Sequence, residues 1–168
     1  MSPSPPAELR ERYREMLHAG ALRPDPAQAM AVEKLQLLAN RIARYRRPTR
    51  TDPFSFFTRK RGEVPYGLYI FGGVGGGKTM LMDLFFDSVD IREKRRDHFH
   101  AFMADVHERA AVFRKTAKGD PIEQVAREIA KDTRLLCFDE FHVTDIADAM
   151  ILGRLFGVLF EAGVVLVA

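Results

Sequence analysis

The chain has 168 residues, of which 46% are hydrophobic and 29% charged, and its formal net charge is +3. This composition predicts one globular domain with a sizeable core, or such a domain with an N-terminal extension, and the single cysteine excludes an internal disulfide. No apolar run reaches the length of a membrane span, and the N-terminal segment lacks the apolar core of a secretory signal, so we expect a cytoplasmic protein.

The N-terminal part of the chain predicts two helices. The first covers residues 7–18 and ends before Gly20. Asp25 can cap the second helix, and Pro26 suits its first position because no backbone donor is needed there. The second helix ends at Pro48. It carries an apolar stripe formed by Leu35, Leu38, Ile42 and Tyr45.

A basic block covers residues 41–61, where eight lysines and arginines stand against one acid, Asp52. Such a block can bind nucleic acid, anionic lipid or an acidic protein surface, but we favour a solvated helix end and loop. The segment also contains Phe54, Phe56 and Phe57, which we expect to pack onto the domain. We assign residues 1–64 to a helical extension and linker, and residues 65–168 to the N-terminal part of a nucleotide-binding domain.

The segment from Gly72 to Thr79 fits the pattern G-x-x-x-x-G-K-[ST], the phosphate-binding loop or Walker A motif of nucleoside-triphosphate enzymes. Five of its positions are glycine, so successive backbone N–H groups can surround the crowded phosphate oxygens. The apolar run 66–71 before the loop suits a buried strand, and the good helix formers of 78–88 follow it. Strand, loop and helix form the context that the motif requires.

Each part of this loop has an expected role toward a nucleoside triphosphate. Lys78 reaches the β- and γ-phosphates, and the hydroxyl of Thr79 ligates Mg²⁺. The N-terminus of the following helix adds its positive end. The expected nucleotide-binding residues are Gly72, Gly73, Val74, Gly75, Gly76, Gly77, Lys78, Thr79 and Met80.

Strands and helices alternate through the rest of the chain. A basic turn over 92–96 leads into a predicted strand, 98–103, and further apolar runs predict strands over 134–138 and 164–168. Two helices separate the first two of these strands, with stripes formed by Val106, Ala110 and Phe113 and by Ile122, Val125, Ala126 and Ile129. A last helix carries Ile146, Met150, Leu155 and Leu159 along one face. This alternation predicts an α/β fold with a parallel sheet.

Two acids, Asp139 and Glu140, follow the strand 134–138. In open α/β sheets the ligand lies beyond the carboxyl ends of the strands, so Asp139 is expected beside the phosphate loop, where it holds Mg²⁺ directly or through water. Glu140 is placed to polarise the attacking water. Alone, such a pair is more often a helix cap than a metal site. Together with the loop it predicts an Mg²⁺-dependent NTP-binding domain, with Lys78 and Glu140 as the expected catalytic residues.

Several segments together resemble one family, namely 67–75, 78–86, 98–100, 137–141 and, most specifically, V-T-D-I-A-D-A-M-I-L over 143–152. They resemble the ZapE-type cell-division ATPases of bacteria and their mitochondrial AFG-like relatives, within the AAA+ class. The resemblance extends from about Asp25 to the last residue. It implies an ATPase that acts on protein partners of the division or quality-control machinery, and a homo-oligomeric ring.

The resemblance also implies roles at matching positions. Lys78 and Thr79 take the phosphate and Mg²⁺ roles, Asp139 the metal role of the Walker B motif, and Glu140 the water-activating role. Gly76 stands where family members often carry a larger residue. The AAA+ strand order 5-1-4-3-2 places the strand 164–168 between the first and third strands.

In the family that strand is followed by a sensor residue, an arginine finger and a helical lid. We therefore expect a C-terminally truncated ATPase domain. Its hydrolysis alone is expected to be weak, because an arginine finger contributes about 10³–10⁵-fold.

Three other functions stay open. A small-molecule kinase shares the loop but usually adds an arginine-rich lid and an acceptor pocket, for which we find no sequence signal. A DNA-associated ATPase of the helicase-loader sort would use the basic block, although nucleic acid is not the favoured partner. A nucleotide-dependent interaction module would bind ATP with little turnover. Contact with a membrane is expected to be peripheral, if there is any.

Overall fold

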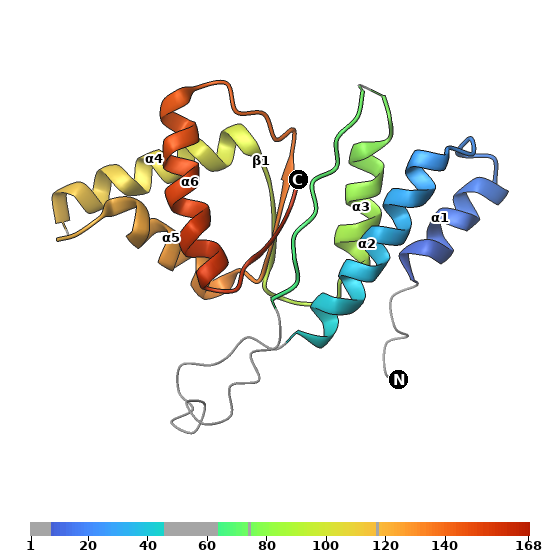
Figure 1. Ribbon diagram of the computed structural model, residues 1–168, viewed down its shortest axis with the longest axis horizontal. Coiled ribbons are helices and arrows are strands. Elements are labelled where there is room, and N and C mark those ends of the chain that lie inside the picture. Colours follow the sequence, from blue (N-terminus) through green and yellow to red (C-terminus); the bar gives the residue numbers. More distant parts are fainter. Residues whose placement is uncertain (1–7, 46–63, 74, 117) are drawn as a thin grey trace. The chain divides into compact units, whose positions relative to one another are not determined.

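The computed structural model describes residues 8–45, 64–73, 75–116 and 118–168 (Figure 1). The chain divides into two compact units, Met1–Ile91 and Arg92–Ala168, and each is described by itself. The predicted boundary after residue 64 concerns the extent of the nucleotide-binding domain and stays a prediction.

Three helices pack on one another in the described part of the first unit: α1 (Leu9–His18), α2 (Pro26–Arg44) and α3 (Lys78–Ser88) (Figure 1). The predicted helices are confirmed, and α3 has the predicted bounds, whereas α2 ends at Arg44, before the predicted end at Pro48. The buried side chains of the three helices include Leu9, Tyr13, Val32, Leu35, Leu38, Ile42, Leu81, Met82, Leu84 and Phe85. Phe54, Phe56, Phe57 and the basic block beyond Tyr45 lie outside the described residues.

The start of α2 lies where the sequence predicts it. One carboxylate oxygen of Asp25 accepts hydrogen bonds from the backbone N–H groups of Ala27 (2.7 Å) and Gln28 (3.3 Å). These N–H groups have no acceptor within the helix, so the cap stabilises the N-terminus by about 1 kcal/mol. Pro26 occupies the first helical position, where its missing N–H does no harm. The cap thereby fixes the turn that carries Gln28.

The predicted buried strand over 66–71 is wrong. Only Leu68 forms a β-bridge in this segment, and the side chains of Tyr66, Tyr69 and Phe71 are 82%, 60% and 84% exposed. An apolar and aromatic composition favours a strand, but a strand forms only where neighbouring strands satisfy its backbone groups and cover its side chains. Composition alone cannot supply those neighbours.

Strands and helices alternate in the second unit, which confirms the predicted α/β fold with a parallel sheet. In chain order the elements are β1 (Lys94–His98), α4 (Phe99–Thr116), α5 (Pro121–Asp132), β2 (Leu135–Asp139), α6 (Ile146–Glu161) and β3 (Val165–Val167). The sheet has the order β1-β2-β3, and both pairs are parallel. The final strand lies beside the strand that ends in Asp139, as the family strand order predicts. The first strand, expected over 66–71 on its other side, is not formed.

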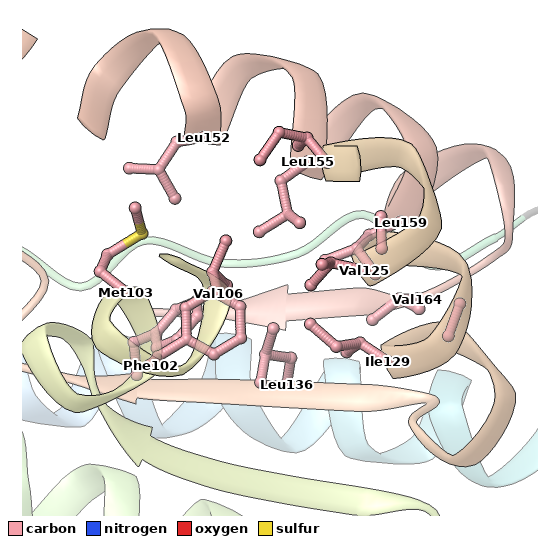
Figure 2. Packing of buried hydrophobic residues seen from close by; sticks show 14 of the residues in the cluster. Phe102, Met103, Val106, Val125, Ile129, Leu136, Leu152, Leu155, Leu159 and Val164 are labelled. Carbon is pink, nitrogen blue, oxygen red and sulfur yellow. The ribbon is translucent and has the colours of Figure 1, made fainter. Parts of the chain in front are cut away.

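The helices α4, α5 and α6 cover one face of this sheet and share a hydrophobic core with it (Figures 1 and 2). Its members include Phe99, Phe102, Met103, Val106, Val125, Ile129, Leu136, Phe138, Leu152, Leu155, Leu159 and Val164. Leu135 and Cys137, the alternate residues of β2, are buried as well. Burial on both faces explains the unbroken apolar sequence of β2. This core anchors the end of the strand at which Asp139 lies.

The predicted strand over 98–103 is wrong in position. The strand β1 covers 94–98 instead, in the segment expected to be a basic turn, and α4 begins at Phe99. Phe99, Phe102, Met103 and Val106 follow one another at spacings of three and four residues, so they form the buried stripe of a helix. A short apolar run can form either a strand or a helix. Here the spacing of three to four residues between the buried positions corresponds to a helix.

The apolar face predicted for the last helix is partly wrong. Leu155 and Leu159 are buried, together with Leu152, whereas Ile146 and Met150 are 80% and 70% exposed. All five residues are apolar, so composition does not distinguish the covered face from the exposed one. Packing against α5 selects the stripe that enters the core.

Candidate nucleotide-binding site

The loop before α3 is shaped by glycines in a backbone conformation that other residues rarely adopt. Gly75 and Gly77 have φ angles of 83° and 76°, in the left-handed region. Between them, the N–H of Gly76 donates a hydrogen bond of 3.3 Å to the carbonyl of Gly73. A side chain at Gly77 would strain the backbone, and its Cβ would lie 2.9 Å from Nε2 of Gln28. The glycines therefore allow a tight turn into the helix.

Lys78 is the first residue of α3, and its ammonium group folds over the loop. Its Nζ donates hydrogen bonds of 2.8 Å to the carbonyls of Gly72 and of Gly73. The helix begins after Gly77, which has no side chain to cap the first N–H groups. A positive charge, exposed helix N–H groups and the positive end of the helix dipole thus meet at one place, as a polyanionic ligand requires.

The two residues after Lys78 lie on the first turn of α3. Thr79 is exposed and Met80 is half-buried. The predicted roles of Thr79 in metal binding and of Met80 in nucleotide binding concern a bound ligand and stay predictions. Val74 lies outside the described residues.

Gln28 reaches this loop from the N-terminal helices. Its Nε2 donates a hydrogen bond of 3.3 Å to the carbonyl of Gly76, and its Oε1 accepts one of 3.3 Å from the hydroxyl of Tyr13. Tyr13 lies on α1 and is buried, which raises the pKa of its hydroxyl. The helical segment is therefore connected to the phosphate loop. Sequence reasoning missed Gln28, because one glutamine in a helix carries no distinctive signal.

The acidic pair lies at the end of β2 in the second unit. Asp139 is the last residue of the strand, and Glu140 follows it with a φ angle of 55°. Among the described residues, Glu140 is the one non-glycine residue with positive φ. Such strain concentrates at functional sites, because the surrounding structure must hold it in place. It turns the chain sharply and leaves Glu140 exposed directly after a buried strand.

Asp139 is paired with Arg96 of β1. The guanidinium donates from Nε to Oδ2 (2.7 Å) and from Nη2 to Oδ1 (2.9 Å), so that the pair is bidentate. The register explains the contact, because Arg96 lies opposite Cys137 and Asp139 is the next residue on that face of β2. Sequence reasoning placed Arg96 in a turn and missed the pair. Recognising 94–98 as a strand would have revealed it.

Cys137 lies in the same strand, two residues before Asp139, and its side chain is fully buried. Burial raises the pKa of its thiol to about 12, although the charge of Arg96 acts in the opposite direction. A thiol with this pKa stays protonated and is a poor nucleophile. Cys137 is a free core residue.

These features define the class of the protein. A glycine loop and lysine at a helix start, followed in sequence by a parallel strand that ends in two acids, are the features of a P-loop NTPase. The chain belongs to the AFG1-like ATPase family, whose model matches residues 7–168.

Similar curated proteins agree with this assignment. Cell division protein ZapE of Escherichia coli is 40% identical over 166 residues, which cover 94% of this chain and 44% of that protein. Lactation elevated protein 1 homolog B of Danio rerio is 55% identical over 113 residues, which cover 62% of this chain and 22% of that protein. The chain thus spans less than half the length of these relatives. No solved structure gives a significant match.

Among the described residues, no helix combines the length and the apolar character needed to cross a bilayer.

Proposed function

We propose that this chain binds ATP with Mg²⁺ and hydrolyses it. The observation that carries the proposal is the position of Lys78, whose ammonium group lies on the carbonyls of Gly72 and Gly73 at the uncapped start of α3. In the proposed complex, Lys78 turns to the β- and γ-phosphates, and the N–H groups of the loop and the first helical turn hold the remaining oxygens. Family membership supports ATP as the nucleotide.

We assign Thr79 and Asp139 to Mg²⁺ on the chemistry of their side chains. Thr79 offers a hydroxyl and Asp139 a carboxylate, and Mg²⁺ prefers a few such oxygens together with the phosphates and water. When bound, the ion neutralises charge on the triphosphate. We assign Glu140 to the attacking water, because its strained backbone holds an exposed carboxylate immediately after Asp139.

The process served by this activity is proposed from the relatives. The name of the Escherichia coli relative is cell division protein, and the family resemblance adds protein quality control. We propose that the protein acts on protein partners in one of these processes and works as a homo-oligomeric ring. Co-purification of tagged protein with and without ATP, followed by identification of the captured proteins, tests the choice between the two processes.

The test of the proposed activity compares the unaltered chain with Lys78→Ala and Glu140→Gln. Lys78→Ala should weaken ATP binding about ten- to hundredfold, because charge-assisted hydrogen bonds to phosphate are lost. Glu140→Gln should bind ATP normally and leave it intact. Lys131→Ala, an exposed lysine of α5, is the control and should change neither property.

Three outcomes contradict parts of the proposal. If Lys78→Ala binds ATP as tightly as the unaltered chain, the loop is not the ATP-binding site. Equal hydrolysis by Glu140→Gln removes the assigned role of Glu140. Bound ATP that stays intact in the unaltered chain indicates a nucleotide-dependent interaction module instead of an ATPase.

A further inference from the structure

The carboxylate of Asp139 is already engaged by a cation of the protein itself. Both of its oxygens accept hydrogen bonds from Arg96, at 2.7 and 2.9 Å, and the two side chains are only 15% and 21% exposed. A bidentate arginine–carboxylate pair holds both groups in one geometry, and partial burial reduces screening by water and salt. The pair therefore sets the orientation and the charge that Asp139 presents.

The neighbouring arginine of β1 makes different contacts. Arg95 pairs with Asp97 of the same strand and with Asp105 of α4 (3.5 Å), and its guanidinium lies 5.6 Å from the ring centre of Phe102. Those contacts tie β1 to the helix that follows it. Arg96 instead reaches across to the end of β2, where the acidic pair lies.

A metal ion at Asp139 would have to share the carboxylate with this guanidinium. Two lone pairs remain on the carboxylate, so binding is not blocked, but a dication beside the guanidinium is repelled by it. The triphosphate carries the negative charge that can offset this repulsion. The ion would then bind well only together with the nucleotide.

We propose that Arg96 is a positioning residue that holds the carboxylate of Asp139 in place and weakens its affinity for a divalent ion, so that the ion is retained only with bound nucleotide. This inference rests on the proposed metal role of Asp139. It makes the Arg96–Asp139 pair part of the ATP cycle instead of a structural contact of the sheet.

The experiment measures Mn²⁺ binding by electron paramagnetic resonance, with and without a non-hydrolysable ATP analogue. The unaltered chain should bind Mn²⁺ much more weakly without the analogue, and equal affinities in the two conditions contradict the inference. The variants are compared with the analogue present. Arg96→Gln removes the charge and should tighten Mn²⁺ binding about three- to tenfold. Arg96→Lys keeps the charge and should stay within about twofold of the unaltered chain. Arg95→Gln is the matched control in the same strand and should not change the affinity.

The variant Asp139→Asn separates this inference from the proposed function. If Asp139→Asn leaves Mn²⁺ affinity unchanged, the metal role of Asp139 fails and the inference fails with it. If Asp139→Asn weakens binding while Arg96→Gln does not tighten it, the inference alone is overturned. Equal weakening by Arg96→Gln and Arg96→Lys also overturns it, because a purely structural contact predicts that result.

A second measurement uses the unaltered chain, so that the test survives if Arg96→Gln does not fold. The side-chain Nε–H of Arg96 gives an NMR signal that Arg96→Lys identifies by its absence. This signal should shift when Mg²⁺ and the ATP analogue are added together, and much less with the analogue alone. An unchanged signal in both cases contradicts the inference.

Discussion

The side-chain amide of Gln28 donates a hydrogen bond of 3.3 Å to the backbone carbonyl of Gly76, which lies 48 positions further along the chain. Gln28 is in the first turn of α2, and the hydroxyl of Tyr13 on α1 donates to its amide oxygen. The N-terminal helices therefore contact the phosphate loop itself. The hydrogen bond therefore links the phosphate loop to the N-terminal helices, which the sequence assigns to a separate extension.

We expect Gln28→Ala to weaken ATP binding about three- to tenfold, because the loop loses a hydrogen bond that holds Gly76 in place. Isothermal titration calorimetry measures the change. Gln124→Ala is the matched control, since Nε2 of Gln124 donates a similar bond of 3.2 Å to the carbonyl of Lys118 in the second unit. Equal affinities in Gln28→Ala and the unaltered chain would show that the contact does not support the loop.

The positive φ angle of Glu140 should lower the stability of the fold, while the carboxylate of Glu140 should support ATP turnover. Glu140→Gly should raise the free energy of unfolding by about 0.5–1 kcal/mol, which is the cost of the left-handed conformation less the extra entropy that glycine loses on folding. It should also lower ATP turnover about 10²-fold or more. Glu140→Gln keeps the strain, so it should lose activity without gaining stability. Urea unfolding and phosphate release measure both effects, and equal stabilities of the two variants contradict the strain argument.

Leu155 lies in the core between α6 and the sheet and is fully buried (Figure 2). We expect Leu155→Ala to lower the free energy of unfolding by about 2–5 kcal/mol, because the truncated side chain leaves a cavity. Met150→Ala, on the exposed face of the same helix, should change it by no more than about 0.5 kcal/mol. Similar losses in both variants would mean that α6 buries a different face.

The raised pKa of Cys137 predicts a loss of stability at high pH. Burial raises the pKa of its thiol from 9.0 to about 12, so the folded chain keeps a proton that the unfolded chain loses. The contribution is fully present below pH 9 and is lost as the pH rises toward about 12. Urea unfolding of Cys137→Ala should lack this part of the pH dependence. Identical slopes for both proteins between pH 9 and pH 11 would contradict the assignment.

Local patterns in the sequence predicted the helices and the candidate motifs. The bounds of α3 and the cap at Asp25 depend on neighbouring residues, so they could be read directly from the chain. The strand 66–71 and the strand 98–103 were wrong, because strand formation depends on partners far away in sequence. The exposed position of Met150 was missed because the packing of α6 against α5, which is also distant in sequence, selects the buried face of the helix.

By itself the sequence determined a glycine loop with Lys78 at a helix start, a buried strand before Asp139 and membership of one ATPase family. These depend on residue type and spacing over short distances. Only the tertiary structure decided that Gln28 contacts Gly76 and that Arg96 pairs with Asp139. Helix packing creates the first contact and strand register the second, and both are set by the free energy of the whole packed unit, which no local pattern contains.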